Sequence, residues 1–474
     1  MRVLLINPYY TEDFCKSARW AAKSRGRVQR HPDWMAYATS VLEHDGHQCS
    51  LFDAQAENQS LTTELRRMIS FEPDMVVIWT TTPSIYSDIT FTRFVKHSFP
   101  KCLTVAVGAH PTALPEETLK IDSCLDVVCV GEFDYTLRDL ANYDSPENVE
   151  GIVWRNGEEI VRNKPRPLIQ DLDSMPFPAW RHINPRIYYD AGKRNPFVTL
   201  ISSRGCSHFC TFCRERHTIE PGKIRYRSAM SLVKEIHNDL RLFPYLKEIM
   251  IEDDTFPTDL NRVNEFCELM LKYKFKISWS CNSRADITDL DTLKNMKKAG
   301  CRWVCVGYES GNQEILDNIH KGVKLDTMYQ FTELAKEAGL QINGCFMFGL
   351  MGESPETAQE TIDFALELNP TMVQFSACVP YPGTPFYDWC KKNNYIVAKD
   401  WNEWVDENYE QKSIVSYPNF SKEQIDFYVD KGLRDFYSSW KRRLNLLKTI
   451  QSFSDLRRVY YGWKSYRNYF GCRT

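Results

Sequence analysis

The chain has 474 residues, about three times the usual size of a domain, so two or three domains are expected. Hydrophobic residues make up 43% and charged residues 26% of the sequence, which excludes disorder throughout the chain. The net charge of −3 argues against a nucleic-acid-binding protein. Because no stretch is apolar enough to span a bilayer and the first residues do not read as a signal peptide, a cytoplasmic location is predicted.

Short apolar runs alternate with helical patterns over residues 1–145. The strand-like runs cover residues 2–8, 48–54, 74–80, 104–110 and 126–132. Five such strands predict a doubly wound parallel sheet, a Rossmann-like domain whose ligands bind beyond the carboxyl ends of the strands. A linker with a small hairpin at Asn156-Gly157 and several prolines is predicted over residues 146–190.

The alternation of strands and helices begins again at residue 191. Six strand-like runs follow, which read FVTLISS, EIMIEDD, SWSCNSR, WVCVGYES, INGCFMFGL and VQFSACVP. Six such units predict a partial (β/α)6 TIM barrel over residues 191–390, again with its site at the carboxyl ends of the strands. Residues 391–474 are predicted to form a helical, basic C-terminal region.

The C-terminal region contains an amphipathic pattern. Its apolar face is formed by Leu433, Phe436, Tyr437, Trp440, Leu444 and Leu447, and its basic face by Lys441, Arg442 and Arg443. A basic helix rich in aromatic residues can rest on an anionic membrane surface, and it can also close a barrel. The sequence leaves both roles open, so peripheral contact with the inner membrane face is one of two interpretations.

Three cysteines, Cys206, Cys210 and Cys213, lie within eight residues and directly follow the first strand of the second unit. Three thiolates on one loop can bind three irons of a 4Fe–4S cluster and leave the fourth iron open for a small ligand. An open iron indicates catalysis rather than electron storage. The alternative is a zinc site completed by His208 or His217, because thiolates also suit zinc.

The CxxxCxxC loop resembles that of the radical S-adenosylmethionine (SAM) superfamily. The resemblance implies that the cluster binds SAM and that electron transfer cleaves it to a 5′-deoxyadenosyl radical. It also implies SAM-binding roles for residues at the strand ends, namely Phe212, Asp253, Asp254, Asn282, Arg284, Glu309 and Phe346. Phe212 and Phe346 would lie near adenine, and the two aspartates would face the methionine amino group. For Glu309, the alternative is an ion pair with Arg284.

The phrases GAHPTALPEE (108–117) and GEFDYTLRDL (131–140) resemble the cobalamin-binding domain that precedes some radical SAM barrels. Cobalamin contacts are then expected from the strand ends of the first unit, at Pro8, Thr81, Ser84, Gly108, His110, Thr112, Gly131 and Glu132. A glycine there lets the backbone approach a flat corrin ring. Asp45-Gly46-His47 is predicted to be a helix-ending turn, which leaves cobalt without a histidine ligand. A domain that binds nothing, or another nucleotide, is the alternative.

Together these resemblances imply a cobalamin-dependent radical SAM enzyme that transfers methyl from methylcobalamin to an unactivated carbon. The same group includes class B radical SAM methyltransferases, the anaerobic magnesium-protoporphyrin ester cyclase and hopanoid-modifying enzymes. Cyclisation, rearrangement or ring contraction of a porphyrin- or lipid-like substrate is therefore an alternative, and a non-catalytic cobalamin or iron–sulfur sensor is another. A reductase such as flavodoxin or ferredoxin is implied as electron donor. Tyr308, Met347, Phe375 and Tyr381 predict either an apolar cavity or barrel core.

Overall fold

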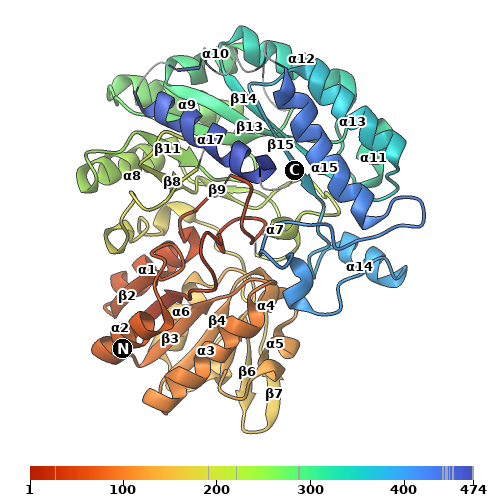
Figure 1. Ribbon diagram of the computed structural model, residues 1–474. Helices are drawn as coiled ribbons and strands as arrows, with labels where there is room; N and C mark the ends of the chain where they lie inside the picture. Colours follow the sequence, from red (N-terminus) through yellow and green to blue (C-terminus); the bar gives the residue numbers. More distant parts are fainter. Residues whose placement is uncertain are drawn as a thin grey trace.

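The computed structural model describes all residues except 27, 191, 220, 287–288, 440–441, 443–446, 448, 451–452 and 472–474. Two α/β units form the lower and upper halves of the molecule in Figure 1. The C-terminal helices pack on the upper unit, and short 3-10 helices lie in the connections, at Pro146–Asn148, Leu172–Ser174, Trp180–His182 and Trp401–Trp404. The predicted α/β fold class is confirmed.

The first sheet has the strand order β2-β1-β3-β4-β5-β6-β7, and its first five members run parallel. Its strands are β1 (Arg2–Asn7), β2 (Gln48–Asp53), β3 (Met75–Trp79), β4 (Leu103–Val107), β5 (Val127–Cys129), β6 (Ile152–Asn156) and β7 (Glu159–Arg162). β6 pairs antiparallel with β5, and β7 with β6. The hairpin that was expected in the linker therefore extends this sheet.

Helices cover both faces of the first sheet. They are α1 (Asp33–His44), α2 (Leu61–Phe71), α3 (Ile85–Ser98), α4 (Ala109–Ala113), α5 (Pro115–Ile121) and α6 (Asp134–Asn142). Alternate residues of β1 serve the two faces, because Val3 packs with Met35 of α1 whereas Leu4 packs with Met68 of α2. α1 ends at the predicted turn, where Gly46 has a φ of 90°.

The second sheet consists of six parallel strands in the order β15-β14-β13-β12-β11-β8, as predicted for the partial barrel. They are β8 (Phe197–Leu200), β11 (Glu248–Ile251), β12 (Ser278–Ser283), β13 (Cys301–Glu309), β14 (Gln341–Phe348) and β15 (Met372–Ala377). The helices of this unit are α8 (Ala229–Leu242), α9 (Leu260–Lys272), α10 (Leu290–Lys298), α11 (Gln313–Asn318), α12 (Leu325–Glu337), α13 (Pro355–Leu368) and α14 (Pro385–Lys392). Polar N-cap residues such as Ser228 and Asp259 start these helices by accepting backbone N–H hydrogen bonds.

The C-terminal region contains α15 (Lys422–Ser438) and α17 (Phe453–Gly471), which lie against the barrel in Figure 1. α15 packs closely on β15, since a Cβ atom at Gly432 would lie 3.0 Å from the ring of Phe375. Phe436 is buried and the Tyr437 hydroxyl lies 3.1 Å from the backbone N of Val373. The apolar face of α15 therefore closes the barrel.

Part of the predicted amphipathic pattern, namely Trp440, Lys441, Arg443 and Leu444, lies outside the described residues. Within the described part of the chain, no helix combines the length and apolar character that crossing a membrane requires.

Candidate active site

The cysteine loop connects β9 (Ser203–Arg204) with β10 (Arg225–Tyr226), and these two strands pair antiparallel at the base of the loop. Gly205 starts the loop with a φ of 93°, and a Cβ atom there would lie 2.7 Å from the Lys223 carbonyl oxygen. Only glycine fits this position without strain. The Thr211 N–H donates to the Ile319 carbonyl oxygen at 3.0 Å, which ties the loop to the barrel.

The chemistry of the loop fits a cluster held by three thiolates. Cys206 and Cys210 are buried, and Cys213 lies directly before α7 (Arg214–His217). Burial, and next the charge of Asp254, raise the pKa of the Cys206 and Cys213 thiols. A bound metal would offset that effect, because it binds the thiolate form.

The described residues do not contain three or more His, Cys, Asp or Glu side chains placed to hold a metal ion. A zinc site would require such convergence, whereas the cysteines of a cubane bind separate irons. His217 Nε2 instead lies 3.2 Å from the Cys210 carbonyl oxygen. The three thiols on one loop are the donor set that a cluster with one open iron requires.

The two aspartates after β11 have opposite environments. Asp253 accepts hydrogen bonds from the N–H and O–H groups of Ser202 and Ser203, at donor–acceptor distances of 2.5–3.1 Å. Its carboxylate is thus occupied inside the protein, and the predicted contact with SAM stays a prediction. Asp254 forms a 2.7 Å ion pair with Arg19, and its Oδ2 atom is buried without a hydrogen-bond partner. Asp254 is therefore the aspartate available to a ligand.

Residues at the ends of β12 and β13 form a polar network. Asn282 Nδ2 donates to the Asp253 carbonyl oxygen at 2.8 Å. Arg284 bonds both carboxylate oxygens of Asp286 and, at 2.7 Å, the Lys321 carbonyl oxygen.

Glu309 pairs with the Lys321 ammonium at 2.8 Å, so the structure does not form the ion pair considered between Glu309 and Arg284. Glu309 lies at a β-bulge with a φ of 68°, a strained conformation typical of functional positions.

The two aromatic residues expected near adenine are placed differently. Phe212 is partly buried against the barrel core. Phe346 is fully buried in the outer layer, where it stacks with Tyr308 and Phe375 and meets the ring of Phe364 on α13. Because successive strand residues face opposite sides, the side chain of Phe346 points toward the helices, and the predicted contact with adenine stays a prediction.

The residues of β14 that alternate with Phe346 face the barrel interior. One of them, Cys345, has its sulfur 3.4 Å from that of Cys305 on β13. Of the residues considered for an apolar cavity, Tyr308 and Phe375 are core, since the Tyr308 hydroxyl lies 2.6 Å from that of Thr332 on α12. Met347 is partly buried on the core, and Tyr381 is buried beneath the guanidinium of Arg214.

Two glycines shape the strand ends of the first unit. Gly108 follows β4 with a φ of 130°, and a Cβ atom there would lie 2.5 Å from the Thr80 carbonyl oxygen. Gly131 follows β5 with a φ of 79°, and no atom lies within 4 Å of the position of its Cβ. The Gly131 N–H donates to Thr112 Oγ1 at 3.1 Å. Open space beside Gly131 fits the close approach of a flat ring such as a corrin.

Other expected cobalamin contacts are engaged inside the protein. His110 Nδ1 lies 3.2 Å from Thr82 Oγ1, and its ring packs edge-on against Trp401. Thr81 and Ser84 share a 2.7 Å hydrogen bond, and Ser84 donates to Asp88.

Asp88 forms a fully buried ion pair with Lys16 at 2.6 Å, and Lys16 also donates to the Pro8 carbonyl oxygen at 3.1 Å. Thr81, Ser84 and Pro8 therefore belong to an internal network that shapes this edge of the sheet.

Glu132 joins the two units instead of facing a ligand. Both of its carboxylate oxygens accept hydrogen bonds from Arg225 at 2.8–2.9 Å. Arg204 forms a second buried pair across the same boundary, with Asp134 at 2.7 Å. Both carboxylate oxygens of Glu132 are used between the units, and its predicted contact with cobalamin stays a prediction.

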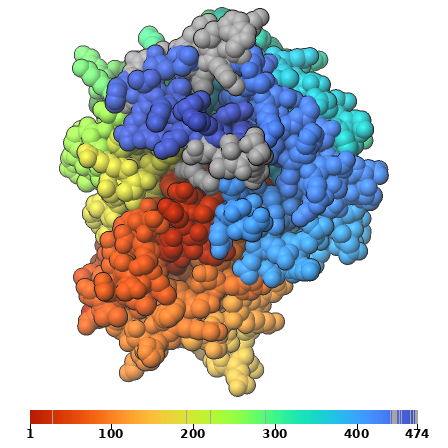
Figure 2. Space-filling model, viewed as in Figure 1, coloured from red at the N-terminus to blue at the C-terminus, as the bar shows by residue number. Residues whose placement is uncertain are grey.

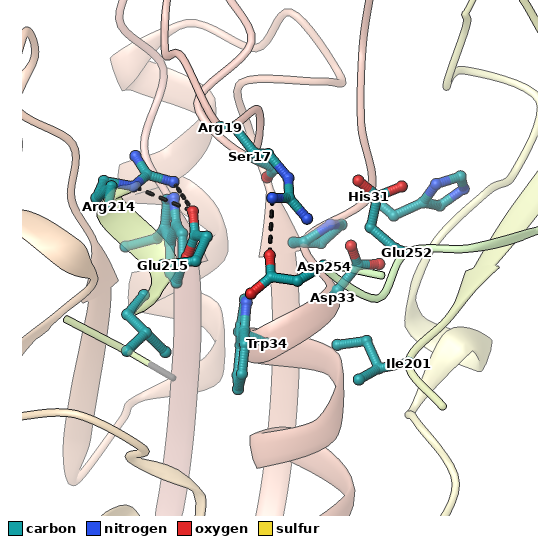
Figure 3. Close-up of a pocket in the computed structure, with 13 residues that line it drawn as sticks. Ser17, Arg19, His31, Asp33, Trp34, Ile201, Arg214, Glu215, Glu252 and Asp254 are labelled. Carbon is teal, nitrogen blue, oxygen red and sulfur yellow. Dashed lines mark hydrogen bonds and ion pairs between the residues drawn. The ribbon is translucent and has the colours of Figure 1, made fainter. Parts of the chain in front are cut away.

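A pocket lies between the two units, and Figure 3 shows its lining. It is lined by Ser17, Arg19, His31, Pro32, Asp33, Trp34, Trp79, Ile201, Arg214, Glu215, Ile219, Glu252 and Asp254. Much of the lining comes from the segment before α1, which lies between the units in Figure 2 (red).

Most of these residues were not predicted from the sequence. Glu252 could have been found, because it lies two positions before Asp254 and therefore on the same side of the strand end. Arg19, His31 and Asp33 lie on a segment without a recognisable pattern.

Comparisons with known proteins agree with this architecture. The family model of the B12 binding domain matches residues 25–141, and that of the Radical SAM superfamily matches residues 200–365. An uncharacterized methyltransferase of Pyrococcus horikoshii is 29% identical over 86% of this chain and 87% of that protein. An anaerobic magnesium-protoporphyrin IX monomethyl ester cyclase of Cereibacter sphaeroides is 28% identical over 82% of this chain and 63% of that protein.

Among solved structures, the radical SAM methyltransferase TsrM from Kitasatospora setae, with cobalamin and a 4Fe–4S cluster bound, superposes with a TM-score of 0.73. The similarity covers 98% of this chain and 99% of that one at 14% identity, so it demonstrates a shared fold. The chain therefore carries a radical SAM domain with a B12-binding domain ahead of it.

Proposed function

We propose that this chain is a cobalamin-dependent radical SAM methyltransferase, which transfers methyl from methylcobalamin to an unactivated carbon of a small molecule. One observation carries the proposal: the pocket lies between the Asp254 end of the barrel, beside the cysteine loop, and the end of β3 in the first unit. A substrate bound there would lie between the two cofactors. The name of the Pyrococcus horikoshii relative agrees with this reaction.

The chain's own residues would divide the work between the two units. Residues 1–145 would hold cobalamin, with Gly131 against the ring, and residues 191–390 would hold the cluster and SAM. Cys206, Cys210 and Cys213 would bind the cluster. The Oδ2 atom of Asp254, which has no hydrogen-bond partner, would accept a hydrogen bond from the amino group of SAM. When bound, the cluster and SAM supply the 5′-deoxyadenosyl radical, and cobalamin supplies the methyl group.

Other residues would support these sites. The Glu309–Lys321 pair and Arg284 would hold the polar edge of the SAM site in place. A one-electron donor of the flavodoxin or ferredoxin type would reduce the cluster.

Ring formation without methyl transfer is the second candidate, because the cyclase of Cereibacter sphaeroides is 28% identical over 82% of this chain. SAM labelled in its methyl group separates the two reactions. The reconstituted enzyme would be incubated anaerobically with labelled SAM, cobalamin, a reductant and candidate substrates. Label in the product together with 5′-deoxyadenosine supports methyl transfer. Formation of 5′-deoxyadenosine with an unlabelled, rearranged product would instead identify a cyclase-like reaction, and absence of both would favour a sensor.

A further inference from the structure

The pocket between the units is rich in carboxylates, and these groups restrict the charge of the substrate that it can bind. Asp33, Glu215, Glu252 and Asp254 line it together with Arg19 and Arg214. The carboxylates of Asp33, Glu252 and Asp254 gather near Arg19 in Figure 3, while Arg214 pairs with Glu215. A lipid or porphyrin ring would cover these polar groups with apolar surface and leave their free hydrogen-bonding atoms without partners, which is unfavourable.

Two carboxylate oxygens in this pocket are buried and lack a donor. Glu252 pairs with Arg30 through one oxygen, and its Oε2 has no hydrogen-bond partner. Asp254 pairs with Arg19 through Oδ1, and its Oδ2 likewise has none. The Glu252 side chain is 13% exposed and that of Asp254 6% exposed, so water satisfies them poorly. A ligand that donates hydrogen bonds would remove this penalty.

Asp33 adds a third acceptor at the start of α1. It accepts a hydrogen bond from the Thr199 hydroxyl, and none of the described Lys, Arg or His side chains forms a salt bridge with it. Burial raises the pKa of Asp33 to about 7, and the positive charges of Arg30 and Lys193 offset this rise only in part. A cation in the pocket would be the missing partner.

His31 and four apolar side chains complete the pocket. His31 is fully buried, stacks on Tyr188 at 4.0 Å between ring centroids, and has no partner for either ring nitrogen. Burial lowers its pKa to about 3, so the ring is neutral and adds one donor and one acceptor. The apolar walls are Trp34, Trp79, Ile201 and Ile219.

We infer that the substrate is a small molecule that carries a protonated amine beside an apolar portion, with the amine bound by Glu252 and Asp33. This inference rests on the proposed function, in which Asp254 is used by SAM. An ammonium group is a strong N–H donor, which suits Glu252 Oε2 and the Asp33 carboxyl, two acceptors that line the pocket. The apolar portion would lie against Trp34 and Trp79, toward the first unit.

The test begins with unfractionated small molecules. The holoenzyme would be incubated anaerobically with trideuteromethyl-SAM and a deproteinised extract of the organism that encodes the chain. Products would be separated into a cation-exchange fraction and an organic-solvent fraction, and compounds derived from SAM alone would be subtracted with a reaction lacking extract. We expect compounds that gain one trideuteromethyl group in the cation-exchange fraction. Label confined to the organic or anionic fraction would overturn the inference but leave methyl transfer standing, whereas no transferred label would remove the proposed function itself.

Variants then test the residues with the labelled amine as substrate. Glu252→Gln keeps the shape of the side chain but removes the carboxylate that would accept a hydrogen bond from the amine. Because one hydrogen bond to a charged group is lost, KM is expected to rise about ten- to hundredfold. Glu265→Gln, on the exposed surface of α9, is the matched control and should leave KM unchanged. Cluster absorption and cobalamin content would show that each variant is folded. If Glu252→Gln does not fold, Asp33→Asn is the second variant, and an unchanged KM in the folded variant would contradict the inference.

Discussion

Asp253 and Asp254 are adjacent, identical in chemistry and opposite in environment, so they provide a matched pair of substitutions. The Asp253 carboxylate accepts four hydrogen bonds from Ser202 and Ser203, and its side chain is fully buried. Asp253→Ala would leave two N–H and two O–H donors without their acceptor. A hydrogen bond to a charged group contributes about 1.5–3 kcal/mol, but the burial cost of the carboxylate disappears with it. We therefore expect the free energy of opening this part of the structure to fall by about 3–5 kcal/mol, the cost of removing one partner from a buried charge network.

The effect should be local, because Ser202 and Ser203 lead directly into the cysteine loop. Hydrogen exchange measured on a peptide spanning residues 198–206 reports local opening and does not require two-state unfolding, which a chain with two α/β units is not expected to show. Asp253→Ala should accelerate exchange there and lower the yield of reconstituted cluster. Asp254→Ala should change exchange much less, because it removes a buried oxygen that has no donor and because water can solvate Arg19, its 47% exposed ion-pair partner.

Two results would refute this reasoning. Equal exchange rates in Asp253→Ala and the unmodified protein would mean that the four hydrogen bonds contribute little. Equal acceleration in Asp253→Ala and Asp254→Ala would mean that the structure does not distinguish the two carboxylates.

Further substitutions address the cluster, cobalamin and pH. Cys210→Ala should abolish the visible absorption of the reconstituted cluster, and an intact cluster that still cleaves SAM would contradict the three-cysteine assignment. Gly108→Ala should weaken cobalamin retention about tenfold or more and spare the cluster, because its Cβ would collide with the Thr80 carbonyl at a φ of 130°; Gly462→Ala, with open space around it, is the control. Burial raises the pKa of Glu353 from 4.5 to about 8, so the folded state keeps a proton that the unfolded state loses. The free energy of unfolding should therefore fall by at most about 4 kcal/mol as pH rises from 4.5 to 8. In Glu353→Gln, the Tm should decrease less over the same pH range.

Local patterns in the sequence determined much of the architecture. Buried runs separated by helical periods predicted both parallel sheets, because strand and helix periods depend only on nearby residues. The spacing of Cys206, Cys210 and Cys213 predicts a cluster-binding loop for the same reason. Asp45-Gly46 was predicted as a helix-ending turn from local chemistry alone, and the structure contains that turn.

Tertiary structure decided which side chains are free to act. Phe346 and Cys345 are adjacent in sequence, yet the pleat of β14 turns one toward the helices and the other toward the barrel interior. The sequence predicts that Glu132 contacts cobalamin, whereas the structure shows its carboxylate hydrogen-bonded to Arg225, which lies far along the chain. The Arg30–Glu252 pair likewise depends on bringing distant segments together. A sequence pattern reports which groups a segment carries, whereas the partners that satisfy those groups come from long-range packing, and only the groups left unsatisfied can bind a ligand.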